Sequence, residues 1–184
     1  MGRIRVHEFT TVDGVVDTPM WAVDFPFTDG MEKALGEVTG SSAAILLGRR
    51  TYEMFAPAWS TRTVEDDPGA PFFNDTHKYV VSSTLADPGW GPATVLPYDA
   101  DRIRALKDEV DGDLYVSGSA TLVRALLADG LVDELNLVQY PVALGEGIRL
   151  FPEGSPRTPL RLDGVEDFGN GVVLLRYAAG AAAG

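Results

Sequence analysis

The segment Ala43-Ala-Ile-Leu-Leu-Gly48-Arg49-Arg50-Thr51-Tyr52 is a short apolar run that stops at a glycine and is followed at once by two arginines and a hydroxyl group. A buried strand that ends in glycine can turn tightly. If a helix follows, its free N–H groups and positive dipole end add to the charge of the arginines. The pattern predicts a strand–turn–helix junction that can hold a phosphate. The alternative is an ordinary junction with two solvated arginines, since neither a P-loop nor a dinucleotide fingerprint is present.

The rest of the chain alternates strand patterns with helix patterns. Residues 57–75 are rich in Pro, Gly, Asp and Thr and are expected to form a long connection, of a length often used as a lid. Gly169-Asn-Gly171 is typical of a hairpin turn. These patterns predict an α/β fold with helices on both faces of a mixed, mainly parallel sheet and a C-terminal antiparallel hairpin. The predicted strands are 3–9, 43–47, 79–82, 94–97, 114–117, 133–138, 160–168 and 172–177, and the predicted helices are 30–40, 49–56, 101–109 and 120–127.

Composition restricts the classes of function. A chain of 184 residues with 45% hydrophobic content suits a single domain, expected over 1–178, with a disordered small-residue tail at 179–184. The formal net charge of −12 argues against nucleic acid and anionic membranes as partners. Cysteine is absent, which excludes disulfides and thiolate metal sites and favours a cytoplasmic location. We expect no metal site, since neither histidine has a ligand spacing, and no signal peptide or membrane span.

Three segments with hydroxyl groups, glycine or arginine follow predicted strands. They are 48–51, 82–84 and 118–121, which read Gly-Arg-Arg-Thr, Ser-Ser-Thr and Gly-Ser-Ala-Thr. Taken singly, the second could be a polar turn and the third a tight turn whose serine caps the next helix. Ligands of α/β sheets bind outside the carboxyl ends of the strands. Together the segments could supply the separate donor clusters that the pyrophosphate and the 2′-phosphate of a dinucleotide require.

These residues, in this order and spacing, resemble the dihydrofolate reductase-like superfamily. The resemblance spans nearly the whole chain and is to stand-alone proteins similar to the C-terminal reductase domain of the bifunctional riboflavin-biosynthesis deaminase/reductase. It rests on Thr11-Val-Asp-Gly-Val-Val16, Leu46-Leu-Gly-Arg-Arg-Thr-Tyr-Glu53, Lys78-Tyr-Val-Val-Ser-Ser-Thr-Leu85, Val116-Ser-Gly-Ser-Ala-Thr-Leu122, Leu131-Val-Asp-Glu-Leu135 and Pro141-Val-Ala-Leu-Gly-Glu-Gly-Ile-Arg-Leu-Phe151.

The resemblance implies NADPH as the cofactor. It places Gly48, Arg49, Arg50 and Thr51 near the phosphates, Ser82 and Ser83 near the 2′-phosphate, and Thr11 and Val16 beside the nicotinamide, with Asp13-Gly14 as a structural turn in a loop that can close. The family's glycine pair, commonly joined by a cis peptide bond, corresponds to Gly118-Ser119. A serine there argues against the cis bond, which costs ~3 kcal/mol without proline. The helix start after it, Ala120, Thr121 and Leu122, would offer N–H groups to the pyrophosphate.

The chemistry is less well defined than the cofactor site. Asp24 and Asp29 are both candidates for the catalytic carboxylate, although each could be a solvated or helix-capping residue. The aromatic side chains of Trp21, Phe25 and Phe55 could stack on a flat heterocycle, and Tyr140 could donate a proton.

The expected function is an NADPH-dependent reductase that transfers a hydride to a small heterocyclic or ribose-linked carbonyl or imine, of the pteridine or riboflavin-precursor kind. The alternatives are a nucleotide-binding protein of the same fold without turnover and a purely structural domain. The resemblance also implies a homodimer formed through a sheet face or edge, for which the apolar region 131–151 is available.

Overall fold

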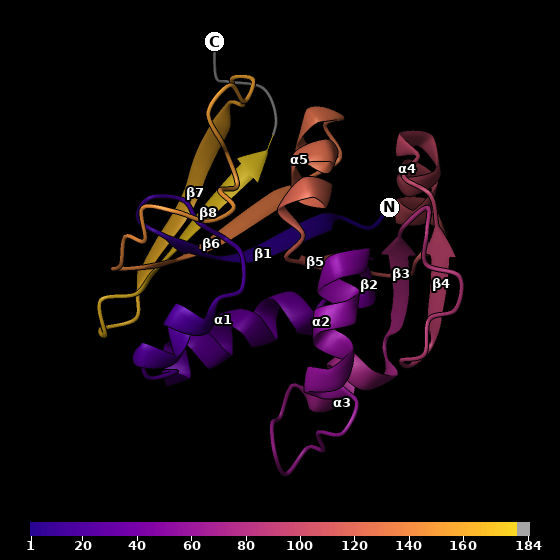
Figure 1. Ribbon diagram of the computed structural model, residues 1–184, viewed down its shortest axis with the longest axis horizontal. Coiled ribbons are helices and arrows are strands. Elements are labelled where there is room, and N and C mark those ends of the chain that lie inside the picture. Colours follow the sequence, from indigo (N-terminus) through magenta and orange to yellow (C-terminus); the bar gives the residue numbers. More distant parts are fainter. Residues whose placement is uncertain (180–184) are drawn as a thin grey trace.

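A computed structural model describes residues 1–179 of the chain and shows one eight-stranded sheet in the order β4-β3-β2-β5-β1-β6-β8-β7 (Figure 1). The strands are β1 (Ile4–Thr11), β2 (Ser42–Gly48), β3 (His77–Val81), β4 (Ala93–Leu96), β5 (Asp113–Ser117), β6 (Glu134–Tyr140), β7 (Leu160–Asp167) and β8 (Val173–Ala179). The helices are α1 (Asp29–Gly40), α2 (Arg49–Trp59), α3 (Ala70–Asp75), α4 (Ala100–Glu109) and α5 (Ala120–Ala128), with a 3-10 turn at Met20–Asp24.

The sheet is mixed in the way that the sequence predicts. The six strands from β4 to β6 run parallel. Strand β8 pairs antiparallel with β6, and β7 pairs antiparallel with β8 to complete a hairpin. Ala179 ends β8, and the rest of the predicted tail lies outside the described residues. The predicted mainly parallel sheet with a C-terminal antiparallel hairpin is therefore confirmed.

Helices cover both faces of this sheet (Figure 1). On one face α4 and α5 pack on the apolar side chains of β1 and β5, among them the fully buried Ile4 and Val6. On the other face α1, α2 and α3 pack around Tyr115 of β5, whose ring contacts Phe72 and Phe73 edge to face. Burial of these apolar surfaces is the main force that holds the layers together.

The segment 57–75 differs from the prediction of one long connection. Helix α2 continues through Pro57 to Trp59, and α3 forms within the segment, with a proline in its first turn. The ring of Phe73 stacks on Trp59 with centroids 4.2 Å apart and meets Phe55 edge to face. These contacts join residues more than a helix turn apart, so local periodicity gives no sign of them.

Capping residues fix where the helices begin. The hydroxyl group of Thr28 accepts a hydrogen bond from the N–H of Met31, so Thr28 caps α1 and Asp29 is the first helical residue rather than the cap. The carboxylate of Asp99 accepts from the N–H of Arg102 and caps α4.

Candidate active site and cofactor site

A crevice opens at the carboxyl end of β5 because this strand is shorter than its neighbours. Strand β1 pairs with β5 only as far as His7 opposite Ser117, yet it continues beside β6 to Thr11. Strand β2 pairs with β5 as far as Ile45 and then only with β3. The space beyond the end of β5 is a cavity of about 520 Å³, at the edge where ligands of open α/β sheets bind.

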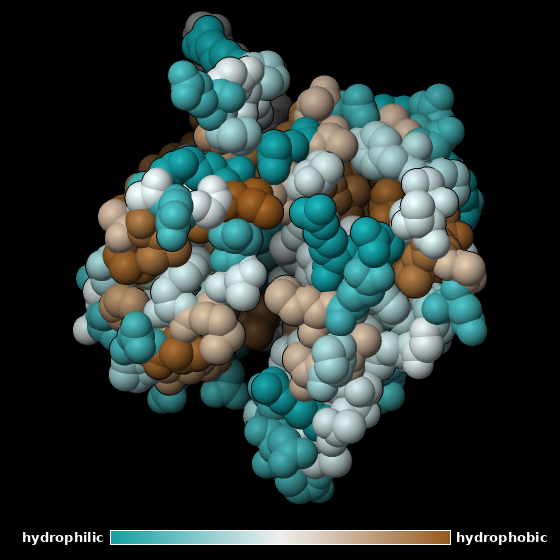
Figure 2. All heavy atoms as spheres, in the orientation of Figure 1, coloured by the Kyte–Doolittle hydropathy of each residue, from teal (hydrophilic) through white to brown (hydrophobic). Residues whose placement is uncertain are grey.

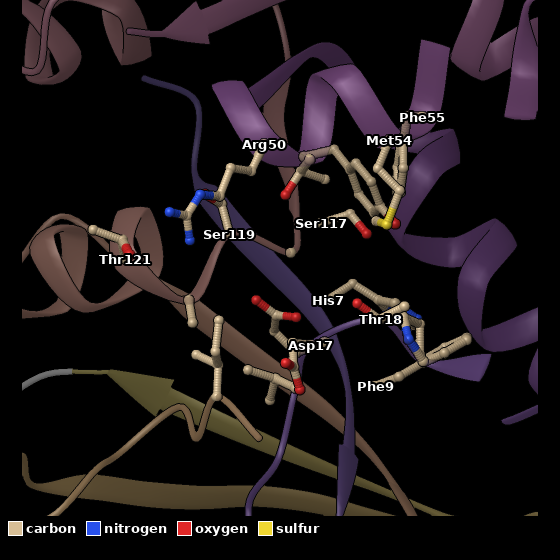
Figure 3. Close-up of a pocket in the computed structure, with 18 of the residues that line it drawn as sticks. His7, Phe9, Asp17, Thr18, Arg50, Met54, Phe55, Ser117, Ser119 and Thr121 are labelled. Atoms are coloured by element: carbon tan, nitrogen blue, oxygen red, sulfur yellow. The ribbon is translucent and has the colours of Figure 1, made fainter. Parts of the chain in front are cut away.

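The cavity has an apolar interior and a few polar groups at defined places. Figure 2 shows the surface hollowed between the positions of α1 and α2, with hydrophobic colouring inside the hollow. In Figure 3, Arg50, Met54 and Phe55 of α2 lie across the cavity from His7 and Asp17. The residues around it are His7, Glu8, Phe9, Val16, Asp17, Thr18, Pro19, Leu35, Arg50, Thr51, Met54, Phe55, Trp59, Phe73, Tyr115, Ser117, Gly118, Ser119, Ala120, Thr121 and Ile148.

Two helix N-termini meet at one end of the cavity. Neither α2 nor α5 has a side-chain cap, so the first N–H groups of both helices remain available to a ligand. The starts of the two helices are in close contact, because a Cβ atom added to Gly48 would overlap the side chain of Ser119. A Cβ atom on Gly118 would come within 3.3 Å of Thr51. This pair of uncapped ends fits the chemistry of a pyrophosphate group.

The turn before α5 has an unusual backbone. Ser119 has φ 69° and ψ 73°, a left-handed conformation that disfavours residues with a side chain, and Gly118 before it has φ 67°. No cis peptide bond occurs within residues 1–179. The Gly118-Ser119 bond is therefore trans, as the serine suggests, and the strained serine brings its side chain to the cavity.

The two arginines of the first junction point to different places. The guanidinium group of Arg49 donates to the carboxylate of Glu53 at 3.0 Å on the exposed side of α2. Arg50 lines the cavity together with Thr51. Of the two, Arg50 is the one placed to meet an anionic ligand there.

Seven of the thirteen predicted cofactor residues line the cavity. The other six do not, namely Thr11, Gly48, Arg49, Ser82, Ser83 and Leu122. The hydroxyl group of Ser82 accepts hydrogen bonds from the N–H groups of Thr84 and Leu85, which makes this segment a polar turn after β3. Ser83 follows in the same turn, and its contact with a 2′-phosphate stays a prediction. Gly48 precedes the first residue of α2, and Leu122 of α5 is buried in the core. The hydroxyl group of Thr11 accepts a hydrogen bond from the N–H of Val15 and so supports the loop that follows β1.

That loop is anchored by Asp13. Its carboxylate accepts hydrogen bonds from the hydroxyl group of Thr11 and from the N–H groups of Leu144 and Gly145, and these bonds lower its pKa to about 2. The guanidinium group of Arg149 lies 3.4 Å away. Asp13 is thus a structural residue, as expected, and it ties 11–17 to 144–149 so that Val16, Asp17 and Ile148 face the cavity.

Most of the predicted substrate aromatics belong to the core instead. Phe55 lines the cavity, but Trp21 and Phe25 pack edge to face on Tyr140, with ring centroids 5.1 Å and 5.4 Å apart. Burial raises the pKa of Tyr140 to about 12, which makes its hydroxyl group a poorer proton donor than a free tyrosine. These three residues form a cluster with Phe9 beneath α1 and do not reach the cavity wall.

The predicted acids also lie elsewhere. Asp24 and Asp29 are both exposed and do not line the cavity, so the structure supports neither as the catalytic carboxylate. The segment before α1 packs Trp21 and Phe25 against Tyr140 and leaves its carboxylates toward solvent.

The cavity instead contains two polar residues that sequence reasoning missed. Glu8 and His7 on β1 are only 3% and 5% exposed, and the Oε1 atom of Glu8 and the Nδ1 atom of His7 have no hydrogen-bond partner within the described chain. Burial raises the pKa of Glu8 to about 8. Burial, and then the charge of Arg5, lowers the pKa of His7 to about 4. Both side chains are thus held neutral near pH 7.

Other kinds of site are not found in the described part of the chain. Within residues 1–179 no group of three or more His, Asp or Glu side chains could hold a metal ion. Among the described helices, none combines the length and the apolar character that crossing a membrane requires.

Comparison with known proteins identifies the relatives of this chain. The family model described as the RibD C-terminal domain matches residues 3–174. A protein from Shewanella sp. PV-4 assigned to riboflavin biosynthesis has a similar structure, with a TM-score of 0.79 at 18% identity over 98% of this chain and 100% of that one. The riboflavin biosynthesis reductase Rib7 of Saccharomyces cerevisiae gives 0.63 at 13% identity, covering 97% and 90%. The dihydrofolate reductase of Enterococcus faecalis, solved with NADP(H), gives 0.60 at 16% identity, covering 98% of each chain.

Proposed function

The chain belongs to the RibD C-terminal domain family, and on that premise we propose that it is an NADPH-dependent reductase. Its substrate is a small heterocycle or a ribose-linked compound with a C=O or C=N bond, of the pteridine or riboflavin-precursor kind. The solved relatives include one reductase of riboflavin biosynthesis and one reductase with NADP(H) bound, which supports both the class of reaction and the cofactor.

The observation that carries this proposal is the division of the cavity into a phosphate-binding end and an apolar part. The uncapped starts of α2 and α5, with Arg50 beside them, suit the pyrophosphate of a dinucleotide. The apolar part, lined by Phe9, Met54 and Phe55, suits flat rings and excludes water from them. When bound, NADPH supplies the hydride, and the protein contributes binding, orientation and charge placement.

Cofactor binding gives a direct test. NADPH is titrated against the purified protein by nicotinamide fluorescence, with NADH as the comparison cofactor. The Arg50→Ala variant should bind NADPH at least tenfold more weakly, since a charge-assisted contact with a phosphate contributes about 1.4 kcal/mol or more. Arg49→Ala is the matched control and should bind nearly as well as the wild type, because Arg49 is paired with Glu53.

The outcomes separate the candidate functions. NADPH-selective binding, followed by loss of nicotinamide absorbance with a pteridine or pyrimidine from a panel, would support the reductase. Binding with no turnover on any compound would favour a nucleotide-binding protein. If neither dinucleotide binds, the reductase assignment fails.

A homodimer remains part of the proposal. Leu144 and Phe151 of the 131–151 region are large apolar residues with about two fifths of their surface exposed. Exposed apolar side chains so close together are typical of a surface that another chain covers. Light scattering coupled to size-exclusion chromatography would distinguish a dimer from a 19.7 kDa monomer. A cytoplasmic location stays a prediction.

A further inference from the structure

Glu8 occupies a position on β1 where the core would otherwise continue. Side chains of alternate residues on a strand share a face, so Glu8 follows Ile4 and Val6, which are both fully buried. Strand β5 ends opposite His7, one residue earlier, and the cavity begins there. Glu8 therefore places a carboxyl group in the wall of the cavity at the end of an otherwise apolar face.

Within residues 1–179 no cation pairs with this carboxyl group. The nearest arginine on the same strand, Arg5, donates to Glu134 and to Ser41 and is engaged there. The other ionisable groups that line the same cavity are His7, whose ring is neutral near pH 7, Tyr115, whose pKa is raised by burial, Asp17 and Arg50. An unpaired carboxyl group in such surroundings keeps its proton, and burial raises the pKa of Glu8 to about 8.

We propose that Glu8 is the catalytic acid of this site, an inference that rests on the proposed reductase function. When the substrate carbon accepts two electrons with the hydride, its C=N or C=O π bond breaks and a C–H bond forms. The O–H bond of the Glu8 carboxyl group then breaks, and its proton bonds to the nitrogen or oxygen atom. NADPH is oxidised to NADP⁺, and the Glu8 carboxylate regains a proton from water.

The other ionisable groups of the cavity are less suited to this step. His7 is neutral near pH 7 because its pKa is about 4, so the protonated ring that could act as an acid is scarcely populated. Asp17 is only half-buried, whereas Glu8 is 3% exposed. An acid that operates near neutral pH needs a pKa in that range, which Glu8 has.

The protonation state can be measured without turnover. Protein carrying ¹³C-labelled glutamate is titrated by NMR, and Glu8→Gln is compared with the wild type. Glu32→Gln, at an exposed site on α1, is the matched control. One carboxyl resonance should titrate near pH 8 in the wild type and in Glu32→Gln, and it should be absent from Glu8→Gln. If every glutamate titrates below about pH 6, the proposal is overturned.

Proton donation to a ligand is tested with 1,3-dimethyllumazine, a fluorescent heterocycle that offers hydrogen-bond acceptors and has no ionisable proton in this pH range. The NADP⁺ complex of the wild type should bind the probe at pH 7, and the affinity should fall about tenfold for each pH unit above the pKa of Glu8. Glu8→Gln should bind with no such pH dependence. The proposal is overturned if the affinity for the probe is the same in the wild type and in Glu8→Gln and does not change with pH, or if no binding is seen up to the solubility of the probe.

These measurements separate two kinds of failure. If Glu8 titrates near pH 8 but NADPH does not bind, the reductase function fails. If NADPH binds to the wild type and to Glu8→Gln alike but no glutamate titrates near pH 8, the reductase stands and Glu8 is not its acid.

Discussion

The free energy of unfolding of the wild-type protein should fall as the pH rises from about 6.5 to 8, and replacing Glu8 with glutamine should abolish this fall. The pKa of Glu8 is about 8 in the folded protein against 4.5 for a free glutamate, with burial as the cause. Between these values the folded state holds one proton that the unfolded state has released, so stability falls as the pH rises. The fall is about 1.4 kcal/mol per pH unit and about 5 kcal/mol in total.

His7 contributes the opposite slope over part of this range. Its pKa is about 4 in the folded protein against 6.5 when free, so between these values the unfolded state holds the extra proton and stability rises with pH. The two slopes cancel from pH 4.5 to 6.5. From pH 6.5 to 8 only that of Glu8 remains, and over these 1.5 units the wild type should lose about 2 kcal/mol.

Urea unfolding, followed by tryptophan fluorescence between pH 4 and 9, measures these slopes. Glu8→Gln should show no fall from pH 6.5 to 8 and should reveal the rise that His7 causes below pH 6.5. The buried amide has its own cost, about 1–3 kcal/mol if unpaired, but that cost is the same at every pH. Glu32→Gln should follow the wild type in parallel. If the difference between Glu8→Gln and the wild type does not change with pH, Glu8 is not held as a neutral acid.

Two further predictions concern the loops around the cavity. Gly48→Ala should unfold the junction of α2 and α5 and abolish NADPH binding, because the new Cβ would overlap Ser119, and adding Ser119→Gly should restore the junction and the binding. Ser119→Gly alone should raise the free energy of unfolding by about 1 kcal/mol, since it relieves a left-handed serine. Thermal unfolding and NADPH titration of the wild type, the two single variants and the double variant test these expectations. Asp13→Asn should weaken the anchor between 11–17 and 144–149: the pKa of Asp13 is lowered to about 2, so its stabilising effect is present above the normal value of 3.8 and is lost as the pH falls toward 2. Faster hydrogen exchange at Leu144 and Gly145 at neutral pH should follow, and unchanged exchange would contradict it.

Much of the fold could be predicted because its signals are local. The strand at 43–47 is a short apolar run, the helix at 30–40 has apolar residues at helical spacing, and Gly48 marks the turn between strand and helix. Helix α3 and the end of α2 could not be predicted in the same way. They depend on Phe73 stacking against Trp59, a contact that exists only after the chain has folded.

The same distinction explains which site residues sequence reasoning found. Arg50 and Ser119 belong to strand–turn–helix junctions, and a junction of that kind is readable from consecutive residues. Whether an aromatic ring lines a cavity or fills a core depends on its partners. Trp21 and Tyr140 are 119 positions apart in the chain yet pack edge to face, so composition and spacing alone could not separate them from a binding surface.

Glu8 was missed although the sequence does carry a sign of it. In Arg3-Ile-Arg-Val-His-Glu-Phe9 the apolar residues Ile4 and Val6 define one face, and period two requires the next residue on that face to be apolar as well. Glutamate stands there, and Phe9 stands on the face that had been polar. Such an inversion in the middle of a strand puts an ionisable group where a core side chain is expected. Its burial lowers stability, and proteins retain a cost of this kind at functional sites. The inversion coincides with the end of β5 and the start of the cavity, so the break in the pattern marks the point where the strand changes from building the core to lining the site.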